Sequence, residues 1–418
     1  MRTMKDSGLS WVGEIPSDWV AHPVYYYFGE RKNKNIFGQE DNLLSLSYGR
    51  VIRKDINTNG GLLPESFNTY NIVEAGDIII RPTDLQNDKK SLRTGLCLER
   101  GIITSAYIAL RPIRRLNSGF FRYLLHAYDI SKVFYNMGNG VRQGLNFSEF
   151  SRLTVFEPPI EIQDKITRYL DTATAEVDKI ISDIQTQIDT LEQYKRSVIT
   201  ETVTKGLNPN SEMKDSGVFY MAPMNATWRL TKIGYICSKL SRSFAPEDTA
   251  LICSNKGKVQ VRADDLTGIM VSDDNAMQGI RSGDIAIHGM DTWHGAIALS
   301  EYDGKITRVV HVCDSTEDKR FVVYYMQHLA FQGVYKLISN GVRGNTSDFR
   351  SWDKVRDIWI AIPETKEEQA AICDYLDSQC TAVEEVIATK KEQLEVLGEY
   401  KKSLIFEYVT GKKEVPVS

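Results

Sequence analysis

Residues 163–171 read QDKITRYLD and residues 369–377 read QAAICDYLD, so Gln, Ile, Tyr, Leu and Asp recur 206 positions apart. The same offset holds further along the chain, at Tyr194 and Tyr400 and at Lys195 and Lys401. An offset that stays constant over so long a stretch indicates an element that tolerates no insertion or deletion. A long helix that occurs twice in a repeat protein has this property.

Residues 160–205 fit such a helix, because they contain neither Gly nor Pro and are followed by Gly206 and Pro209. About 40 residues at ~1.5 Å each predict a rod of roughly 60 Å. Apolar residues recur every three or four positions, which predicts a narrow seam for one partner helix. They are Ile166, Leu170, Ala173, Val177, Ile180, Ile184, Ile188, Leu191, Tyr194 and Val198. The second copy provides the obvious partner, and we predict a helix–helix interface of Ile166, Leu170, Val177, Ile184, Leu191, Leu376, Val383, Leu394 and Leu397.

Shorter blocks repeat in the same order ahead of each rod. MKDSG occupies residues 4–8 and 213–217, GDI residues 76–78 and 283–285, and NGVR residues 139–142 and 340–343. The chain is therefore predicted to be one unit used twice, with a domain at 1–157, a helix at 158–206, a second domain at 207–364 and a second helix at 365–418. Both domains show short strand patterns with helical patterns between them, so we predict an α+β fold of two mixed α/β domains separated by two long helices.

The strands and shorter helices of the two domains are predicted at matching places. Short apolar runs predict strands at Asn42–Leu46, Gly76–Arg81 and Tyr107–Arg111, and at Ala250–Cys253, Gly283–His288 and Ile306–Val312. Helical patterns cover Phe120–Tyr135 and Arg320–Ser339, and each ends in an Asn-Gly turn.

Composition limits the class of protein. The 418 residues carry a net charge of −4, and the acidic excess lies in the predicted helices, since residues 158–212 and 365–418 carry −4 each and residues 1–157 carry +4. Domains that are neutral to mildly basic permit contact with nucleic acid. No apolar run approaches the ~18 residues of a membrane span, and the N-terminal residues lack the apolar core of a signal peptide. Six scattered cysteines without a CxxC pair predict reduced, buried thiols in a cytoplasmic protein.

Motifs for catalysis by this chain are missing from the sequence. Methyl transfer to a base needs a Gly-rich cofactor loop and an Asp/Asn-Pro-Pro-aromatic site, whereas the only Pro-Pro lies at residues 158–159 with other flanks. The GxxxxGK[ST] loop of a nucleotide-driven motor is also missing, and so is any spaced Cys and His set for zinc. We predict neither a catalytic site nor a cofactor or metal in this chain.

One segment keeps an enzymatic alternative open. His288, Asp291 and His294 lie within seven residues and are the residue types of a metal site or an acid–base pair. The corresponding stretch of the first copy, Arg81 to Arg93, contains no His. A site found in one copy and replaced by basic and polar residues in the other favours a variable reading loop over catalysis.

Loops after matching strands favour contact with DNA. Residues 47–50 (SYGR) correspond to residues 254–258 (SNKGK), and residues 138–144 (GNGVRQG) to residues 339–345 (SNGVRGN). Glycines let the backbone approach a phosphate, and the paired Arg can bind that phosphate or a guanine edge, although each loop alone also fits a plain turn with a solvated Arg. The predicted DNA-binding residues are Tyr48, Arg50, Arg81, Lys89, Lys90, Arg93, Asn139, Arg142, Gln143, Asn255, Lys256, Lys258, His288, Asp291, Trp293, His294, Asn340, Arg343 and Asn345.

With these motifs assembled, the chain resembles the specificity subunits of type I restriction–modification systems over nearly its whole length. The motifs that carry the resemblance are WVGEIPSDW at residues 11–19, the two GDI strands, the two GVR loops, the ExQxxIxxYLD entry at residues 161–171 and 367–377, and the LxxYKxSxI rod ends. The second opening departs from this pattern, since residues 219–228 read FYMAPMNATW.

The resemblance implies two target recognition domains, each reading one half of an interrupted double-stranded DNA target, and two helices packed as an antiparallel coiled-coil spacer. It implies as partners two modification subunits, which bind S-adenosylmethionine and methylate adenine, and two ATP- and Mg-dependent restriction subunits. An orphan specificity subunit that exchanges target specificity, or sequesters modification subunits, is the alternative without catalysis.

Overall fold

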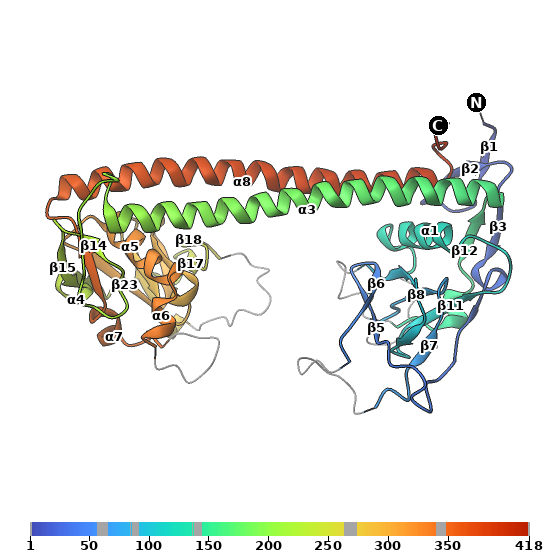
Figure 1. Ribbon diagram of the computed structural model, residues 1–418, viewed down its shortest axis with the longest axis horizontal. Coiled ribbons are helices and arrows are strands. Elements are labelled where there is room, and N and C mark those ends of the chain that lie inside the picture. Colours follow the sequence, from blue (N-terminus) through green and yellow to red (C-terminus); the bar gives the residue numbers. More distant parts are fainter. Residues whose placement is uncertain are drawn as a thin grey trace. The chain divides into compact units, whose positions relative to one another are not determined.

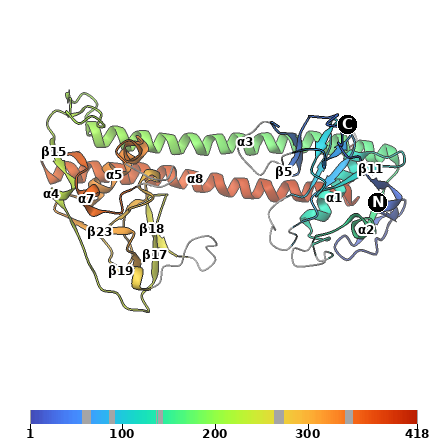
Figure 2. The ribbon, with the colours of Figure 1, turned by 90° about the horizontal axis from the view of Figure 1, so that it is seen from below.

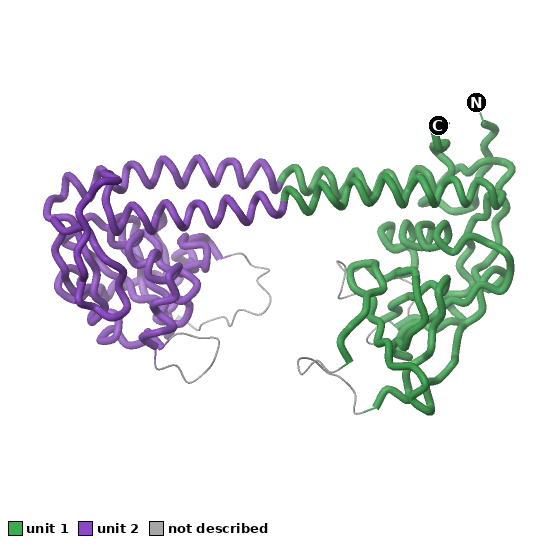
Figure 3. The backbone as a smooth tube through the Cα atoms, viewed as in Figure 1, with its two compact units in different colours: residues 1–184, 392–418 green, residues 185–391 purple. Residues whose placement is uncertain are grey.

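The computed structural model describes residues 2–56, 66–83, 85, 92–135, 137, 144–262, 274–339 and 348–416. The chain forms two units, one of residues 1–184 with 392–418 and one of residues 185–391 (Figure 3). Both boundaries fall inside long helices, α3 (Ile160–Lys205) and α8 (Lys366–Val409). This division groups each predicted domain with segments of both helices.

Helices α3 and α8 pack side by side, as the sequence predicts (Figure 1 and Figure 2). Contacts between residues of the two helices show that they run antiparallel. In unit 1 the late residue Lys401 of α8 meets the early residue Asp178 of α3 at 2.5 Å, and in unit 2 Lys390 of α8 meets Gln187 of α3 at 2.5 Å. The prediction of an α+β fold with two long paired helices is therefore confirmed.

Unit 1 contains a four-stranded antiparallel sheet in the order β4-β11-β8-β9, flanked by two-stranded pairs β1-β2, β3-β12, β5-β6 and β7-β10. Its elements are β1 (Met4–Asp6), β2 (Glu14–Pro16), β3 (Val20–Pro23), β4 (Phe28–Glu30), β5 (Leu44–Ser47), β6 (Arg50–Arg53), β7 (Asn71–Val73), β8 (Ile78–Ile80), β9 (Thr94–Leu96), β10 (Gly101–Ile103), β11 (Ile108–Pro112), α1 (Ser118–Ile130), α2 (Phe147–Phe150) and β12 (Thr154–Glu157).

Unit 2 contains a matching four-stranded sheet in the order β16-β23-β20-β21 and a second one in the order β18-β17-β22-β19. Its elements are β13 (Met213–Lys214), β14 (Met224–Asn225), β15 (Arg229–Lys232), α4 (Ile233–Ile236), β16 (Cys237–Lys239), β17 (Ala250–Ser254), β18 (Lys258–Val261), β19 (Met277–Ile280), β20 (Ile285–His288), β21 (Ile297–Leu299), β22 (Gly304–Thr307), β23 (Val310–Ser315), α5 (Lys319–Phe331), α6 (Val334–Leu337), α7 (Trp352–Arg356) and β24 (Trp359–Ile362).

The two GDI motifs begin the same strand in each unit. Ile78 opens β8 and pairs with Leu96, and Ile285 opens β20 and pairs with Leu299. The glycine ahead of each strand, Gly76 or Gly283, has a positive φ of 94° or 83°, a backbone conformation that Gly adopts without steric cost. The two predicted GDI strands therefore exist and occupy equivalent interior positions in their sheets.

The MKDSG motifs hold a buried tryptophan in place. Lys5 Nζ donates to the backbone oxygen of Trp19 at 2.5 Å, and Lys214 Nζ donates to that of Trp228 at 2.8 Å. Both indole side chains are buried, and each meets the glycine that ends a long helix, Gly411 for Trp19 and Gly206 for Trp228. Each motif thus joins the start of a domain to the end of a long helix.

The hydrophobic cores of the two units extend into the helix pair. In unit 1, Leu170 of α3 and Leu404 of α8 pack with Phe120 and Phe121 of α1. In unit 2, Val203 of α3 and Leu376 of α8 pack with Phe321 of α5. Because each core takes residues from both long helices, neither unit completes its core without the helix pair.

Most of the predicted interface residues face away from water. Ile166, Leu170, Val177, Leu376 and Val383 are buried, and Ile184, Leu191, Leu394 and Leu397 are half-buried. Two of the predicted seam residues are wrong, since Ile180 is 47% exposed and Tyr194 is 50% exposed. After Val177 the less exposed residues are Ile181 and Ile184, which lead to the buried Ile188, so the step from Val177 is four residues and not three. Tyr194 follows two successive steps of three, from Ile188 through Leu191, and these leave the seam.

The shorter predicted elements are present, with one early end and two breaks. Helix α1 ends at Ile130, ahead of the predicted end at Tyr135. Residues 306–312 form the end of β22 and the start of β23 rather than one strand, and residues 320–339 form α5 and α6. Gly333, at φ 70°, separates these two helices because its left-handed conformation ends the α-helical path. Within the residues that the structure describes, no helix is long and apolar enough to cross a membrane. All six cysteines are free and buried.

A matched pair of valines in α8 tests the seam. Val383 is 8% exposed and Val396 is 67% exposed. We expect Val383→Ala to lower the free energy of unfolding by about 1.5 kcal/mol, because about two buried methyl groups are lost at ~0.8 kcal/mol each. Val396→Ala should change it by less than ~0.5 kcal/mol. Chemical denaturation of the full chain measures both, and equal effects would contradict the buried seam.

Candidate nucleic-acid interface

Each unit presents a β-hairpin whose turn carries residues predicted to bind DNA. In unit 1, Tyr48 and Gly49 join β5 to β6 with φ angles of 45° and 77°, as in the type I′ turns that fit hairpin twist. Tyr48 is 85% exposed at the tip of this turn. In unit 2, Asn255, Lys256 and Gly257 join β17 to β18, and the first two are exposed. Exposed aromatic and cationic groups on a rigid turn suit contact with a nucleic acid.

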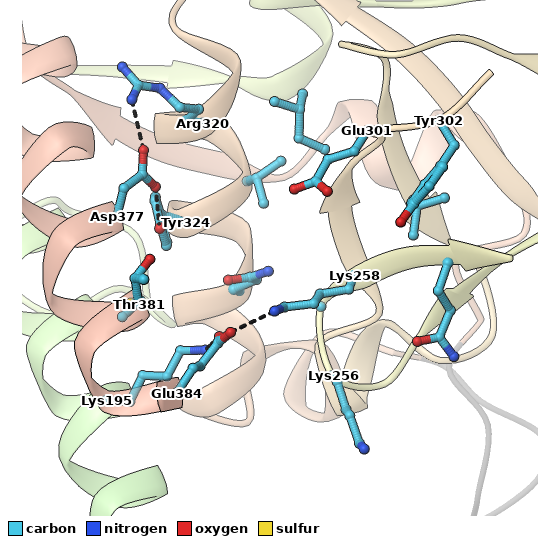
Figure 4. A pocket seen from close by; sticks show the side chains of 17 residues that line it. Lys195, Lys256, Lys258, Glu301, Tyr302, Arg320, Tyr324, Asp377, Thr381 and Glu384 are labelled. Atoms are coloured by element: carbon cyan, nitrogen blue, oxygen red, sulfur yellow. Dashed lines mark hydrogen bonds and ion pairs between the residues drawn. The ribbon is translucent and has the colours of Figure 1, made fainter. Parts of the chain in front are cut away.

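The first residue after each turn is a cation that pairs with a carboxylate of the helix pair. Arg50 Nη2 lies 2.5 Å from Asp178 Oδ2 of α3 in unit 1. Lys258 Nζ lies 2.6 Å from Glu384 Oε2 of α8 in unit 2 (Figure 4). Asp178 and Glu384 are 206 positions apart, the offset of the helical repeat. Both hairpin turns are thus held to the long helices by the same kind of ion pair.

Each carboxylate also has a second cation, which comes from the other long helix. Lys401 of α8 lies 2.5 Å from the Oδ1 atom of Asp178, and Lys195 of α3 pairs with Oε1 of Glu384. Burial on its own raises the pKa of Glu384, but hydrogen bonds from Lys195 and Lys258 outweigh it and hold that pKa below its usual range. One carboxylate therefore connects both long helices and the hairpin turn of its unit.

Beside each turn lies a cavity that is lined by this ion-pair cluster. The cavity of unit 2 has a volume of about 670 Å³ and is lined by Lys195, Lys258, Arg320, Tyr324, Asp377 and Glu384, among others (Figure 4). The cavity of unit 1, of about 710 Å³, is lined by the corresponding Lys401, Arg50, Arg122, Tyr123, Asp171 and Asp178. The two units therefore place the same chemical groups around equivalent openings.

The repeated Tyr-Leu-Asp motif fixes the wall of each cavity. Tyr123 Oη donates to Asp171 at 2.8 Å in unit 1, and Tyr324 Oη donates to Asp377 at 2.6 Å in unit 2. Burial raises the pKa of both phenols, which keeps each a hydrogen-bond donor. These bonds join the domain helix, α1 or α5, to the long helix, so the repeated carboxylates already have hydrogen-bond partners within the chain.

The glutamine of the same motif caps the domain helix. Gln163 Oε1 accepts from the backbone N–H of Asn117, the N-cap of α1, at 2.9 Å. Gln369 Oε1 accepts from that of Asp318, the N-cap of α5, at 2.9 Å. The motif that reveals the repeat in the sequence therefore docks the domain helix, α1 or α5, onto the long helix that follows the domain.

Arg93 is a correction to the predicted DNA-binding residues. Its side chain is buried, Nε donates to Tyr135 at 3.0 Å, and its backbone N–H donates to the Asp129 carboxylate at 2.6 Å. A guanidinium that is enclosed in the domain core is not presented to DNA. Arg81 is half-buried, and its carbonyl oxygen faces the same guanidinium.

The segment from His288 to His294 forms part of a turn. Burial lowers the pKa of His288, against the opposing charge of Asp291, and the ring nitrogen Nδ1 accepts from the backbone N–H of Asp291 at 3.0 Å. His294 is half exposed and its ring lies 3.9 Å from Asp291. Trp293 is half-buried beneath Lys336. Among the residues that the structure describes, no three His, Cys, Asp or Glu side chains are grouped to hold a metal ion.

Several predicted residues lie outside the described part of the chain. These are Lys89, Lys90, Asn139, Arg142, Gln143, Asn340, Arg343 and Asn345. Their assignment to DNA binding remains a prediction.

The cations supplied by the helices were missed at the sequence level. A third cavity of about 360 Å³ in unit 2 is lined by Lys195, Arg196, Lys256, Lys258 and Lys391, together with His294 and other residues. Lys195 and Lys401 match at the repeat offset and directly follow Tyr194 and Tyr400, beside the predicted seam. A lysine repeated next to the seam in both helices is a signal that could have identified the cluster.

No protein-family model matches the chain, and a search of curated proteins finds no match. Among solved structures, the chain is similar to one from a study of complex assembly and conformational transition of the type I R-M system, with 14% identity, 96% of this chain and 99% of that chain covered, and a TM-score of 0.66. It also matches the HsdS subunit from Thermoanaerobacter tengcongensis, with 14% identity, coverage of 96% and 98%, and a TM-score of 0.45.

A further match is the S subunit of a type I restriction–modification system from M. genitalium, with 12% identity, coverage of 93% and 96%, and a TM-score of 0.39. The match with a TM-score of 0.66 shows that the chain has the fold of a type I restriction–modification system chain over nearly its whole length. The resemblance drawn from the repeated motifs is thereby confirmed at the level of the fold.

Two buried histidines predict how stability depends on pH. Burial lowers the pKa of His126 in unit 1 and of His328 in unit 2 to about 4, from an ordinary value of 6.5. Between pH 6.5 and about 4 the unfolded chain binds more protons than the folded chain, so stability falls as the pH is lowered through this window. The expected slope is about 1.4 kcal/mol per pH unit for each histidine.

The His328 ring nitrogen Nδ1 lies 3.2 Å from Thr200 Oγ1, within hydrogen-bond distance. Replacement of His328 by Gln, which can also form a hydrogen bond there, should remove one such contribution and flatten the acid side of the stability profile. The wild-type chain, measured in the same series, is the reference. Denaturant titrations at a series of pH values measure the slopes. An unaltered slope for the His328 variant would contradict the assignment of a buried neutral ring.

Proposed function

We propose that this chain is the specificity subunit of a type I restriction–modification complex, and that it reads a bipartite DNA target without performing chemistry itself. In this proposal each recognition domain reads one half-site, and the paired helices set the separation of the two half-sites. Partner subunits methylate adenine or cleave the DNA.

The observation that carries the proposal is the duplicated hairpin turn on a shared helical frame. Each unit presents a turn with an exposed cation, Arg50 or Lys258, tied to the long helices in the same way. The turns differ in their other exposed residues, Tyr48 in one and Asn255 with Lys256 in the other. Equivalent frames with different exposed residues are expected of two readers of two different half-sites.

The fold supports the same proposed function. The similar structure with a TM-score of 0.66 belongs to a study of a type I R-M system, and 99% of that chain is covered. By this proposal two modification subunits supply the S-adenosylmethionine site, two restriction subunits supply the ATP and Mg sites, and the assembly works in the cytoplasm. The separation of catalysis from recognition fits a chain whose repeated carboxylates are engaged in hydrogen bonds and ion pairs.

Two other functions give different experimental results. An orphan subunit that exchanges specificity would co-purify with modification subunits encoded elsewhere in the genome. An enzyme that acts through His288 and His294 would lose its chemistry when both are replaced. The proposal expects such a double variant to keep the chemistry of the full complex, with at most a change of target.

The methylated adenines of the native host test the function directly. We expect sequencing of modified bases to reveal one motif with two fixed parts and an unspecified gap, which disappears when the gene is deleted. Purification of the tagged chain should bring down a methyltransferase subunit. A host genome without such a motif, together with an assembly that binds all duplexes equally, would contradict the proposal.

The turn cations predict a change in the salt dependence of DNA binding. We expect Arg50→Ala and Lys258→Ala each to weaken binding and to reduce the slope of log K against log[salt] by ~0.9, the value for one lost phosphate contact. Suitable controls are Arg2→Ala and Lys232→Ala, because these cations pair with Asp18 and Asp357 elsewhere in the same units. Fluorescence anisotropy at several salt concentrations measures the slopes, and equal slopes for the turn and control variants would argue against phosphate contact.

A further inference from the structure

The carboxylates that hold the hairpin turns are each shared between two cations of unequal exposure. Arg50 is 69% exposed and Lys258 is 61% exposed, whereas the helix lysines Lys401 and Lys195 are 28% and 25% exposed. The carboxylates Asp178 and Glu384 are 29% and 36% exposed. In both units the turn cation is therefore the outer member of the cluster, and the acid with its helix lysine is the inner pair.

The arrangement occurs twice with the roles of the helices exchanged. In unit 1 the acid belongs to α3 and the inner lysine to α8, and in unit 2 the acid belongs to α8 and the inner lysine to α3. The turn cation is an arginine in one unit and a lysine in the other. The charges are kept although the residue types of acid and turn cation both change, which indicates that the charge pattern itself matters.

We propose that Asp178 and Glu384 are internal stand-ins for DNA phosphate: each binds the turn cation in the free protein and gives it up when a phosphate takes its place. This inference rests on the proposed function, since it requires that the turns meet DNA. It assigns to the two acids a regulatory role in DNA binding, distinct from the positioning of the recognition domains by Asp171 and Asp377.

The helix lysines lower the free-energy cost of this exchange. If a carboxylate lost its only partner in a partly buried site, the desolvated charge would oppose the release. Here Lys401 or Lys195 remains bound to the acid after the turn cation has left, so the acid stays neutralised. The turn cation is long and exposed, and it exchanges one anionic oxygen for another with little change in its own hydration.

Competition of this kind weakens binding to every duplex by the same factor. A turn that makes only phosphate contacts with a random sequence gains little net binding free energy, because its internal ion pair must first be broken. A turn that also contacts base edges recovers that cost. At a protein concentration that still saturates the tightly bound target, the acids therefore lower the occupancy of non-specific DNA, which offers far more sites than the target does.

Neutral variants of the two acids test the competition. Asp178→Asn and Glu384→Gln should each tighten binding to a mixed-sequence duplex about two- to fivefold at low salt, the range expected for an exposed ion pair. The advantage should shrink as the salt concentration rises, because screening weakens the internal pair in the wild type as well. Asp183→Asn and Glu385→Gln are matched controls, since both acids are exposed on the same two helices.

A double variant separates local competition from a general loss of negative charge. Asp178→Asn in an Arg50→Ala background should give no tightening beyond that of Asp183→Asn, because the cation that gains from the change is missing. Anisotropy with the full chain, co-purified with whatever subunits accompany it, measures every affinity, and thermal unfolding identifies variants that have lost their fold. Glu384→Gln with Lys258→Ala repeats the test in unit 2.

The outcomes are distinct. Weaker binding by the neutral variants, with unaffected controls, would show that the acids position the turns, and unchanged binding would show no competition; either result overturns the inference. Tightening that persists without the turn cation also overturns it. If the wild-type chain binds no duplex at all, the proposed function itself fails, and that result is visible before any variant is compared.

Discussion

The antiparallel packing of α3 against α8 is the constraint on which the rest of the molecule depends. Each helix begins in the core of one unit and ends in the core of the other, so that Leu170 and Leu404 share one core and Val203 and Leu376 share the other. A residue inserted into one helix would shift the seam and the docking bonds beyond it by about 100° around the axis. This explains why the offset of 206 residues is kept through the helices while the domains vary in length.

Hydrogen bonds and ion pairs join the two domains to this frame at repeated points. The Tyr-to-Asp hydrogen bonds fasten α1 and α5, and the shared carboxylates fasten the hairpin turns. The first set is partly buried and fixes geometry. The second set is exposed on its outer side, where a pair contributes ~0–1 kcal/mol and can be exchanged for another anion. A frame that is fixed at the helix and carries an exposed ion pair at the turn fits the proposed binding of DNA by the turn.

The sequence predicts the frame better than the site, for physical reasons. The seam follows from the helical period. Ile180 and Tyr194 are apolar but exposed, because each lies one residue ahead of the position that faces the partner helix. The docking roles of Gln163 and Asp171 could not be read from the sequence, because their partners lie 46 and 48 residues away and the chain must fold before they meet. Arg93 was misassigned because a loop arginine is usually exposed, whereas here Asp129 and Tyr135 bind it inside the core.

The most direct test of the central claim is selection of bound duplexes from a random pool by the purified assembly. The account predicts enrichment of two short fixed sequences separated by a gap of constant length and free sequence, since two domains read and one helix pair sets their separation. Enrichment of a single uninterrupted sequence, or a gap that varies from one selected duplex to the next, would contradict it.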